Sequence, residues 1–217
     1  MLWVLVVSRS DIGPTLLHLC KYQNNPGPRH WDAVLWLLGY LAATKHLPLT
    51  FGGVAAPQLR LECFCDSNYE KNEFCKSTSG YVVTLGGIGS LCWSSKYQET
   101  TALSSTEAEY VALTPAVKQV LWLRMMLTEL GIPSDPTGSP TIIWCDNTST
   151  IKLTSHEVAH GRSKHINVKF HFIRDHIGAK EIDVRKIPSA ANRADQQSKT
   201  TQAAPLFVAQ RALNLGL

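Results

Sequence analysis

The chain has 217 residues, of which 44% are hydrophobic and 18% charged, and a formal net charge of +4. These values are typical of a globular protein with one good core, or with one domain and a fragment of another. The mildly basic charge is compatible with a polyanionic partner without requiring one. No apolar run is long enough to cross a membrane, so we expect no membrane partner.

Six cysteines occur without any Cys-x-x-Cys pair, and Cys63, Cys92 and Cys145 lie in apolar runs. Such cysteines are typical of small core residues in a reducing compartment. The apolar opening, residues 1–8, has neither the basic segment nor the cleavage site of a signal peptide. We therefore expect an intracellular protein, cytoplasmic or nuclear and not secreted.

Residues 1–47 are predicted to be helical, with a turn at the Asn-Pro-Gly-Pro sequence of residues 25–28. After this turn, apolar residues recur at helical spacing from Trp31 to Leu41. Proline and glycine residues between positions 48 and 57 end the pattern. We place a domain boundary near Gly53.

Short strands are predicted next, at residues 61–66, 80–85 and 90–94, with a glycine-rich hairpin turn at 86–89. A long helix at residues 101–130 follows, and Gly131 and Pro133 stop it. The remaining elements are a strand at 141–145, helices at 148–153 and 163–178, a strand at 181–187 and a final helix that contains Asp195.

The long helix carries a carboxylate where an apolar residue is expected. Ser104 is a good N-cap, and Glu107, three residues later, completes a capping box. Glu109 lies on another side of the helix, in line with the core-facing Ala112 and Leu113. A buried carboxylate is costly to desolvate unless a cation or a proton compensates it. Glu109 is therefore either a functional side chain or a solvated residue at the rim of the apolar stripe.

Three more acids occupy special places: Asp66 ends the first predicted strand, Asp146 ends the fourth, and Asp195 opens the final helix. If the first and fourth strands are neighbours, their ends and the start of the long helix meet at one point. Four converging carboxylates cannot all be ionised without cations, and hard divalent metals bind such oxygens. Taken singly, each acid also fits a structural role as a turn residue, a helix N-cap or a first-turn charge.

Five collinear segments carry a more specific signal: KSTSGYVVTLGG, CWSSKYQETTALSSTEAEYVAL, LWLRMMLTELGI, WCDNTSTIKL and HGRSKHINVKFHFIRDHI. In order and spacing they resemble the ribonuclease H domain at the C-terminal end of the Pol polyprotein of copia-class LTR retrotransposons. The likeness runs over about residues 61–217. Residues 8–44 resemble the last helices of the reverse transcriptase that precedes this domain. The polymerase fingers and palm are absent, so we expect no DNA synthesis.

The resemblance implies an α/β, ribonuclease-H-like fold, in which helices flank a mixed five-stranded sheet. Residues 54–217 would form this domain, and residues 1–53 a small helical remnant of the reverse transcriptase. Without the rest of the polymerase, Trp31, Trp36 and Leu38 are expected to form an exposed apolar patch.

The resemblance also implies an active site of Asp66, Glu109, Asp146 and Asp195. As metal ligands they would hold two Mg2+ ions about 4 Å apart, with Mn2+ as an alternative. Asp66 would bridge both ions, with Glu109 and Asp146 on one and Asp195 on the other. The implied activity is endonucleolytic hydrolysis of the RNA strand of RNA/DNA hybrids during reverse transcription. The implied partners are the hybrid and the missing reverse transcriptase domains of the same polyprotein.

Choice of the RNA strand requires contacts to its 2′-hydroxyls. Short polar and basic side chains at loop and helix starts suit phosphate and sugar contacts. The residues in such places are Lys76, Ser77, Thr78, Asn147, Arg162, Lys164 and His165. Each of them also fits a merely solvated surface position.

Two segments depart from related sequences. Residues 188–192 lack the histidine that precedes the last acid in cellular ribonucleases H, which predicts slower turnover. Residues 196–199, Gln-Gln-Ser-Lys, are polar where apolar residues are common, so the resemblance gives little basis for predicting how the final helix packs.

Two other functions stay open. Residues 156–160, His-Glu-Val-Ala-His, match the HExxH pattern of zinc peptidases, although no long amphipathic helix is predicted to carry them. The other alternative is a non-catalytic nucleic-acid-binding remnant, decayed or co-opted. The presence of all four acids argues against simple decay of the site.

Overall fold

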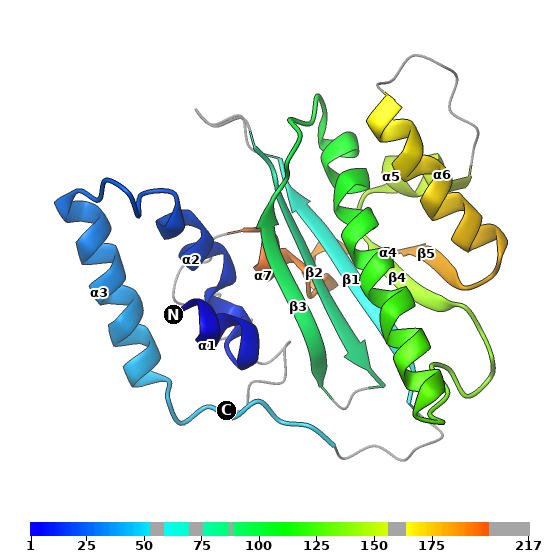
Figure 1. Cartoon of the computed structure of the whole chain (residues 1–217), viewed down its shortest axis with the longest axis horizontal. Coiled ribbons are helices and arrows are strands. Elements are labelled where there is room, and N and C mark those ends of the chain that lie inside the picture. The colour runs from blue at the N-terminus through cyan, green and yellow to red at the C-terminus, as the bar shows by residue number, and fades with distance from the viewer. Residues whose placement is uncertain (53–58, 70–75, 87–88, 156–163, 200–217) are drawn as a thin grey trace.

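A five-stranded mixed sheet forms the centre of the computed structural model, with strand order β3-β2-β1-β4-β5 (Figure 1). The structure describes residues 1–52, 59–69, 76–86, 89–155 and 164–199, and the side chains of all of these except 164–167. The strands are β1 (Leu61–Asn68), β2 (Thr78–Leu85), β3 (Ser90–Tyr97), β4 (Thr141–Cys145) and β5 (Ile182–Lys186). β1, β2 and β3 pair antiparallel, whereas β4 pairs parallel with both β1 and β5. The predicted ribonuclease-H-like fold class is confirmed.

The three antiparallel strands are longer than predicted. The pairing of β1 with β2 runs from Leu61 opposite Leu85 to Asn68 opposite Thr78, so Asp66 lies within β1 and does not end it. The prediction stopped at the end of the apolar run, because polar residues favour loops over strands. Ser67 and Thr78 are nevertheless buried, and the backbone hydrogen bonds of the sheet continue through them.

The helices α4 (Ser105–Glu129), α5 (Thr148–Ser155) and α6 (Lys164–Gly178) cover one face of the sheet (Figure 1). Their apolar side chains and those of β1, β2, β4 and β5 form the main core. The ring centroids of Tyr110 in α4 and Phe170 in α6 are 4.0 Å apart. No helix among the described residues is both long enough and apolar enough to cross a membrane.

The start of α4 is capped as predicted at Ser104 but not at Glu107. The Ser104 hydroxyl accepts a hydrogen bond from the backbone N–H of Glu107 at 3.2 Å. The Glu107 carboxylate accepts from the backbone N–H of Leu103 at 2.9 Å, one residue before the position that a capping box requires. Both bonds still satisfy backbone donors where the chain enters the helix.

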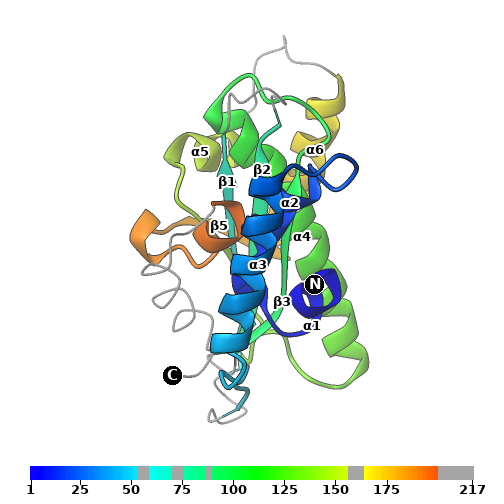
Figure 2. The same cartoon turned by 90° about the vertical axis from the view of Figure 1, so that its left-hand side faces the viewer.

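The N-terminal elements α1 (Leu2–Val7), η1 (Ser10–Ile12), α2 (Gly13–Cys20) and α3 (Pro28–Ala43) lie on the other side of the sheet (Figure 2). The indole N–H of Trp93 in β3 donates to the carbonyl of Leu5 at 2.8 Å, and α2 contacts β3. The expected boundary at Gly53 lies outside the described residues, so the division into residues 1–53 and 54–217 stays a prediction. Trp31, Trp36 and Leu38 are exposed, as expected, at 60%, 51% and 45%.

After β5 the chain forms η3 (Ser189–Ala191) and the four-residue helix α7 (Asp195–Ser198), which contacts β1, β2, β3, α2 and η1. Although residues 196–199 are polar, the two central ones are in the core, because Gln197 and Ser198 are 0% and 2% exposed. Gly80 in β2 makes this packing possible: a Cβ there would lie 2.7 Å from Cβ of Gln197. Any side chain at position 80 would push α7 off the sheet.

Candidate active site

The four acids that the sequence indicated come together at one edge of the sheet. Asp66 lies in β1, Glu109 near the start of α4, Asp146 directly after β4, and Asp195 at the first position of α7. Because β1 and β4 run parallel, their C-terminal ends lie at the same edge. The charges of Asp146 and Asp195 act on Asp66, and those of Asp66 and Asp146 act on Glu109.

Glu109 is buried, with 6% of its surface exposed, so the interpretation as a solvated rim residue is wrong. Burial raises the pKa of Glu109 to about 9, and the charge of Asp66 adds to this. A hydrogen bond from the backbone of Ser67 acts in the opposite direction. The side chain therefore carries a proton at neutral pH unless a cation compensates its charge.

Asp66 is the most buried of the four, at 1% exposure, and burial raises its pKa to about 6. Two groups oppose that shift: the Ser198 hydroxyl donates to Oδ2 of Asp66, and the Lys199 ammonium lies 3.5 Å from the same oxygen. Lys199 also pairs with Asp195. One lysine therefore contacts two of the four carboxylates.

Asp146 is held by its neighbours after β5. Its Oδ2 accepts a hydrogen bond from the Ser189 hydroxyl at 2.6 Å, and its backbone carbonyl accepts from the Lys186 ammonium. The alternative role of Asp146 as the N-cap of α5 is wrong. Asn147 caps that helix, because its Oδ1 accepts from the backbone N–H of Thr150 at 3.0 Å.

The sequence interpretation missed four polar contacts of the acids: Lys186, Ser189, Ser198 and Lys199. Lys199 follows Asp195 by four residues, a spacing at which opposite charges on a helix pair, so it could have been found. The other three contacts depend on how β5, η3 and α7 lie against β1 and β4. No local pattern indicates them.

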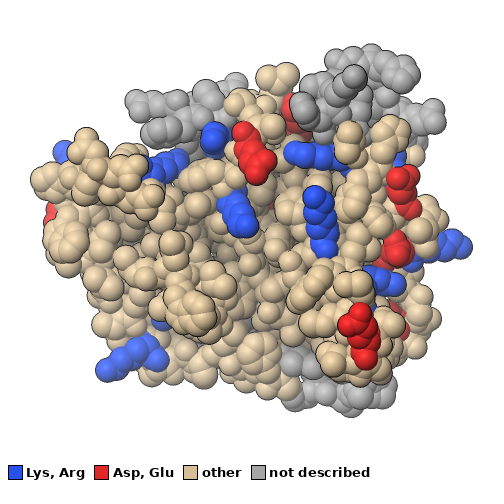
Figure 3. Space-filling model, in the orientation of Figure 1, with Lys and Arg blue, Asp and Glu red and all other residues tan. Residues whose placement is uncertain are grey.

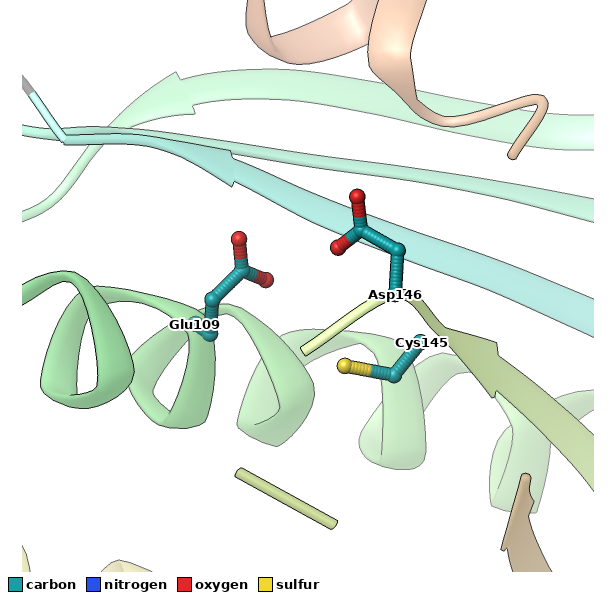
Figure 4. A group of neighbouring side chains, drawn as sticks. All are labelled: Glu109, Cys145 and Asp146. Atoms are coloured by element: carbon teal, nitrogen blue, oxygen red, sulfur yellow. The ribbon is translucent and has the colours of Figure 1, made fainter. Parts of the chain in front are cut away.

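The arrangement fits a divalent cation. Ligand atoms of Glu109, Cys145 and Asp146 all lie within 4.8 Å of one another (Figure 4). Oε2 of Glu109 is buried and has no hydrogen-bond partner among the described residues, which is an unfavourable state for an acceptor. Carboxylate oxygens suit a hard ion such as Mg2+, whereas the Cys145 sulfur suits a softer metal. The residues present therefore fit a hard cation through Glu109, Asp146 and the neighbouring Asp66.

The predicted nucleic-acid contacts are only partly at the surface. Ser77 and Thr78 are 1% and 4% exposed, so their side chains do not offer a surface to a ligand. They lie at the start of β2, which pairs with β3 in the sheet and contacts α7. Lys76 is exposed and Asn147 is half-buried.

The other three candidates, Arg162 and the side chains of Lys164 and His165, lie outside the described part of the chain. The His-Glu-Val-Ala-His motif at 156–160 does so too. Figure 3 shows basic and acidic side chains scattered over one face of the molecule, without a single continuous basic patch.

The comparison with curated proteins shows one family. The retrovirus-related Pol polyprotein from transposon TNT 1-94 of Nicotiana tabacum is 36% identical over 199 residues, which are 92% of this chain and 14% of that polyprotein. The polyprotein from transposon RE2 of Arabidopsis thaliana is 33% identical over 199 residues, which are 90% of this chain and 13% of that polyprotein. The chain belongs to the retrovirus-related Pol polyproteins of transposons. It spans 14% or less of the length of these two Pol relatives.

No protein-family model matches the chain. Among solved structures, LC11-RNase H1, isolated from compost by a metagenomic approach, is similar with a TM-score of 0.46 and 21% identity. That match covers 64% of this chain and 91% of the solved one. The fold assignment of this Pol-family chain rests on its own strand order and strand directions.

Proposed function

We propose that the chain is a ribonuclease H that hydrolyses the RNA strand of RNA/DNA hybrids during retrotransposon reverse transcription. The observation that carries the proposal is the convergence of Asp66, Glu109, Asp146 and Asp195 from four elements, with Glu109 buried and one of its oxygens unpaired. Burial and the neighbouring acids raise the pKa values of Asp66 and Glu109, so these two carboxylates are stable in their ionised form only with cations. Family membership supports the same proposal.

Each acid has a role in the proposal. Asp66, Glu109, Asp146 and Asp195 would hold two Mg2+ ions, or Mn2+ as an alternative. Bound there, the ions would activate a water and stabilise the leaving 3′ oxygen of the RNA. Ser198 orients the Asp66 carboxylate, and Ser189 orients that of Asp146. The product would carry a 5′ phosphate and a 3′ hydroxyl.

The hybrid would be bound by polar and basic side chains around this edge of the sheet. Lys76 is exposed at the entry to β2, the strand that pairs with β1 along Asp66. A lysine there suits a phosphate contact, which positions a duplex without reading its sequence. Asn147, Arg162, Lys164 and His165 remain proposed contacts on the basis of their place in the sequence.

The rest of the Pol polyprotein is the second proposed partner. The N-terminal helices expose several large apolar side chains, among them Trp3 at 77%, Val6 at 70% and Trp31 at 60%. Exposed apolar surface of this kind marks sites of protein contact. We assign residues 1–53 to the end of the reverse transcriptase, and we expect this role to place the protein inside the cell, in the cytoplasm or nucleus.

The test is cleavage of a uniformly labelled RNA/DNA hybrid with Mg2+ or Mn2+. We expect cutting of the RNA strand alone, and its loss in Asp66→Asn, in Glu109→Gln and with a chelator. Removal of one ligand of a catalytic metal typically abolishes turnover. Asp183→Asn is the matched control, since Asp183 is an acid of β5 that pairs with Arg185 away from the cluster. It should cleave as the wild type does.

Other outcomes would assign the chain differently. A folded protein that binds hybrid without cutting it would be the non-catalytic remnant. A zinc-dependent peptidase activity lost in His156→Ala would show that the HExxH motif is the functional one.

A further inference from the structure

The helix α7 carries Asp195 but is too short to be stable by itself. It has four residues and no side-chain cap, and a single turn costs more conformational entropy than its hydrogen bonds return. It nevertheless supplies side chains to the acid cluster. Asp195 is one of the acids, and the Ser198 hydroxyl donates to Asp66. The ammonium of Lys199, the residue after the helix, pairs with both Asp66 and Asp195. Something outside α7 must hold it in place.

Two anchors lie on the sheet. The Asn192 side chain donates to the carbonyl of Cys65 in β1 at 2.9 Å and accepts from the backbone N–H of Ala194. Gly80, which pairs with Asp66 in the sheet, lets the backbone of Gln197 and Ser198 approach so closely that a Cβ would lie 2.8 Å and 2.9 Å from their atoms. These contacts hold α7 against β1 and β2.

The third anchor comes from the N-terminal helices and acts through Gln197. This side chain is fully buried, and its Nε2 donates to the carbonyl of Ser10 at 3.0 Å. Gly13, at the start of α2, faces the same side chain, since a Cβ there would lie 3.0 Å from Oε1 of Gln197. Gln197 therefore fills the space between β2 and the turn from η1 to α2. Its helix, α7, lies between α2 and the sheet (Figure 1).

The N-terminal side of this contact is itself held firmly. Arg9, next to Ser10, donates to Asp11 at 2.8 Å and to the Thr44 hydroxyl at 2.7 Å, and the Tyr40 hydroxyl donates to Asp11 at 2.6 Å. All of Arg9, Asp11 and Thr44 are buried. The network ties η1 to the end of α3, so the Ser10 carbonyl is a fixed acceptor.

From these contacts we infer that Gln197 is a positioning residue, through which the N-terminal helices hold α7 and its Asp195 in register with Asp66. The inference rests on the proposed nuclease function for its effect on catalysis. In this inference, residues 1–47 contribute to catalysis by holding Asp195 in position. A partner that displaces these helices would change the geometry at Asp195.

The test compares two variants on either side of the contact. Gln197→Met keeps the length of the side chain and removes the donor to Ser10, and Gly13→Ala adds a methyl group against Oε1. We expect kcat to fall about tenfold in both and the Mg2+ concentration for half-maximal rate to rise, as for other residues that orient metal ligands. KM for the hybrid should change little. The amide of Lys199, bonded to the carbonyl of Asp195, should exchange faster with solvent in the absence of metal.

Trp93→Phe is the matched control. It removes a hydrogen bond from the sheet to the N-terminal helices, the one that Trp93 donates to Leu5, and changes no residue of α7. It should retain the kcat, the Mg2+ dependence and the α7 exchange of the wild type. An equal loss in Trp93→Phe would overturn the inference, because it would show a general effect of loosened packing.

These experiments distinguish failure of the positioning role of Gln197 from failure of the proposed nuclease function. If the wild type cleaves hybrid and both Gln197→Met and Gly13→Ala match its kcat and Mg2+ dependence, the positioning role is wrong. If the wild type does not cleave, the proposed nuclease function fails, and hydrogen exchange alone decides the inference. Unchanged exchange in α7 of the two variants would then overturn it, and faster exchange would support it.

Discussion

Glu109 carries a larger electrostatic cost than Asp66. Its carboxylate is buried near the start of α4 with Asp66 and Asp146 close by, and these surroundings raise its pKa to about 9. Lys199 offsets part of the same cost at Asp66, where the pKa rises only to about 6. Without a metal, the site is therefore partly protonated and partly neutralised by a lysine. A divalent cation bound there would replace both kinds of compensation.

This electrostatic balance predicts how stability depends on pH. The pKa of Glu109 rises from 4.5 to about 9 on folding, so between these values the folded state holds a proton that the unfolded state has lost. The free energy of unfolding therefore falls as pH rises through this window, and is largest at its acidic end. We expect chemical unfolding in chelator to show lower stability at about pH 8 than at about pH 6, with Mg2+ reversing the loss.

Glu109→Gln should show a flatter pH profile, since the amide cannot ionise. Glu129→Gln, at the exposed far end of the same helix, is the control and should keep the wild-type profile. If Mg2+ stabilises the Glu109→Gln variant as strongly as the wild type, Glu109 is not a metal ligand.

Among the elements, α4 determines the position of Glu109 through the residue at which the helix starts. Its start at Ser105 puts Glu109 on the second turn, facing Asp66 and Asp146 across the end of β1 and β4. The N-cap at Ser104 sets this start, since its hydroxyl accepts from the N–H of Glu107. A helix that frayed by one turn would release Glu109 from the sheet.

Ser104→Ala should therefore lower stability by about 1 kcal/mol, the usual cost of removing an N-cap hydroxyl. Urea unfolding measures this change, and Ser105→Ala, at the exposed first helical position, is the matched control. We expect the control to differ little from the wild type. A Ser104→Ala variant as stable as the control would mean that the packing of α4 on the sheet alone fixes its start.

At the scale of the whole molecule, the N-terminal helices pack against the sheet and α7. Among the described residues, the contacts that join them include Trp93 to Leu5, Gln197 to Ser10, and the Lys21 ammonium 4.3 Å from the centroid of the Tyr97 ring. The buried pair of Arg9 and Asp11 stiffens the helical side, with side-chain exposures of 8% and 0%. The two sides should therefore unfold together.

We expect one cooperative unfolding transition, with tryptophan fluorescence and far-UV circular dichroism changing at the same urea concentration. Asp11→Ala leaves the Arg9 guanidinium buried without its carboxylate and should cost about 3–5 kcal/mol, because breaking a buried pair strands a charge. Asp32→Ala, an exposed acid of α3, is the control. Two separate transitions, of which Asp11→Ala shifts only one, would show that the N-terminal helices unfold independently.

Some of the site was predictable from the sequence and some was not. Glu109 stood out because a carboxylate in line with Ala112 and Leu113 breaks the apolar pattern of a helix, and that signal is local. The contacts of Ser198 with Asp66 and of Ser189 with Asp146 join residues 132 and 43 positions apart, and no periodicity indicates them. Ser77 and Thr78 were misjudged for the same reason, since polar residues are usually exposed and their burial depends on what packs over β2.

The sequence by itself determined the order and type of the elements, because helical and strand periodicity and capping residues act within a few positions. It also determined which acids belong together, because the collinear segments resemble one family. The tertiary structure alone decided that Asp66 lies inside β1, that Glu109 is buried, and that Gln197 joins the N-terminal helices to α7. Burial and long-range hydrogen bonds depend on which elements pack together, and a polar residue such as Gln197 can be stable in a core only when its partner is brought to it by the fold.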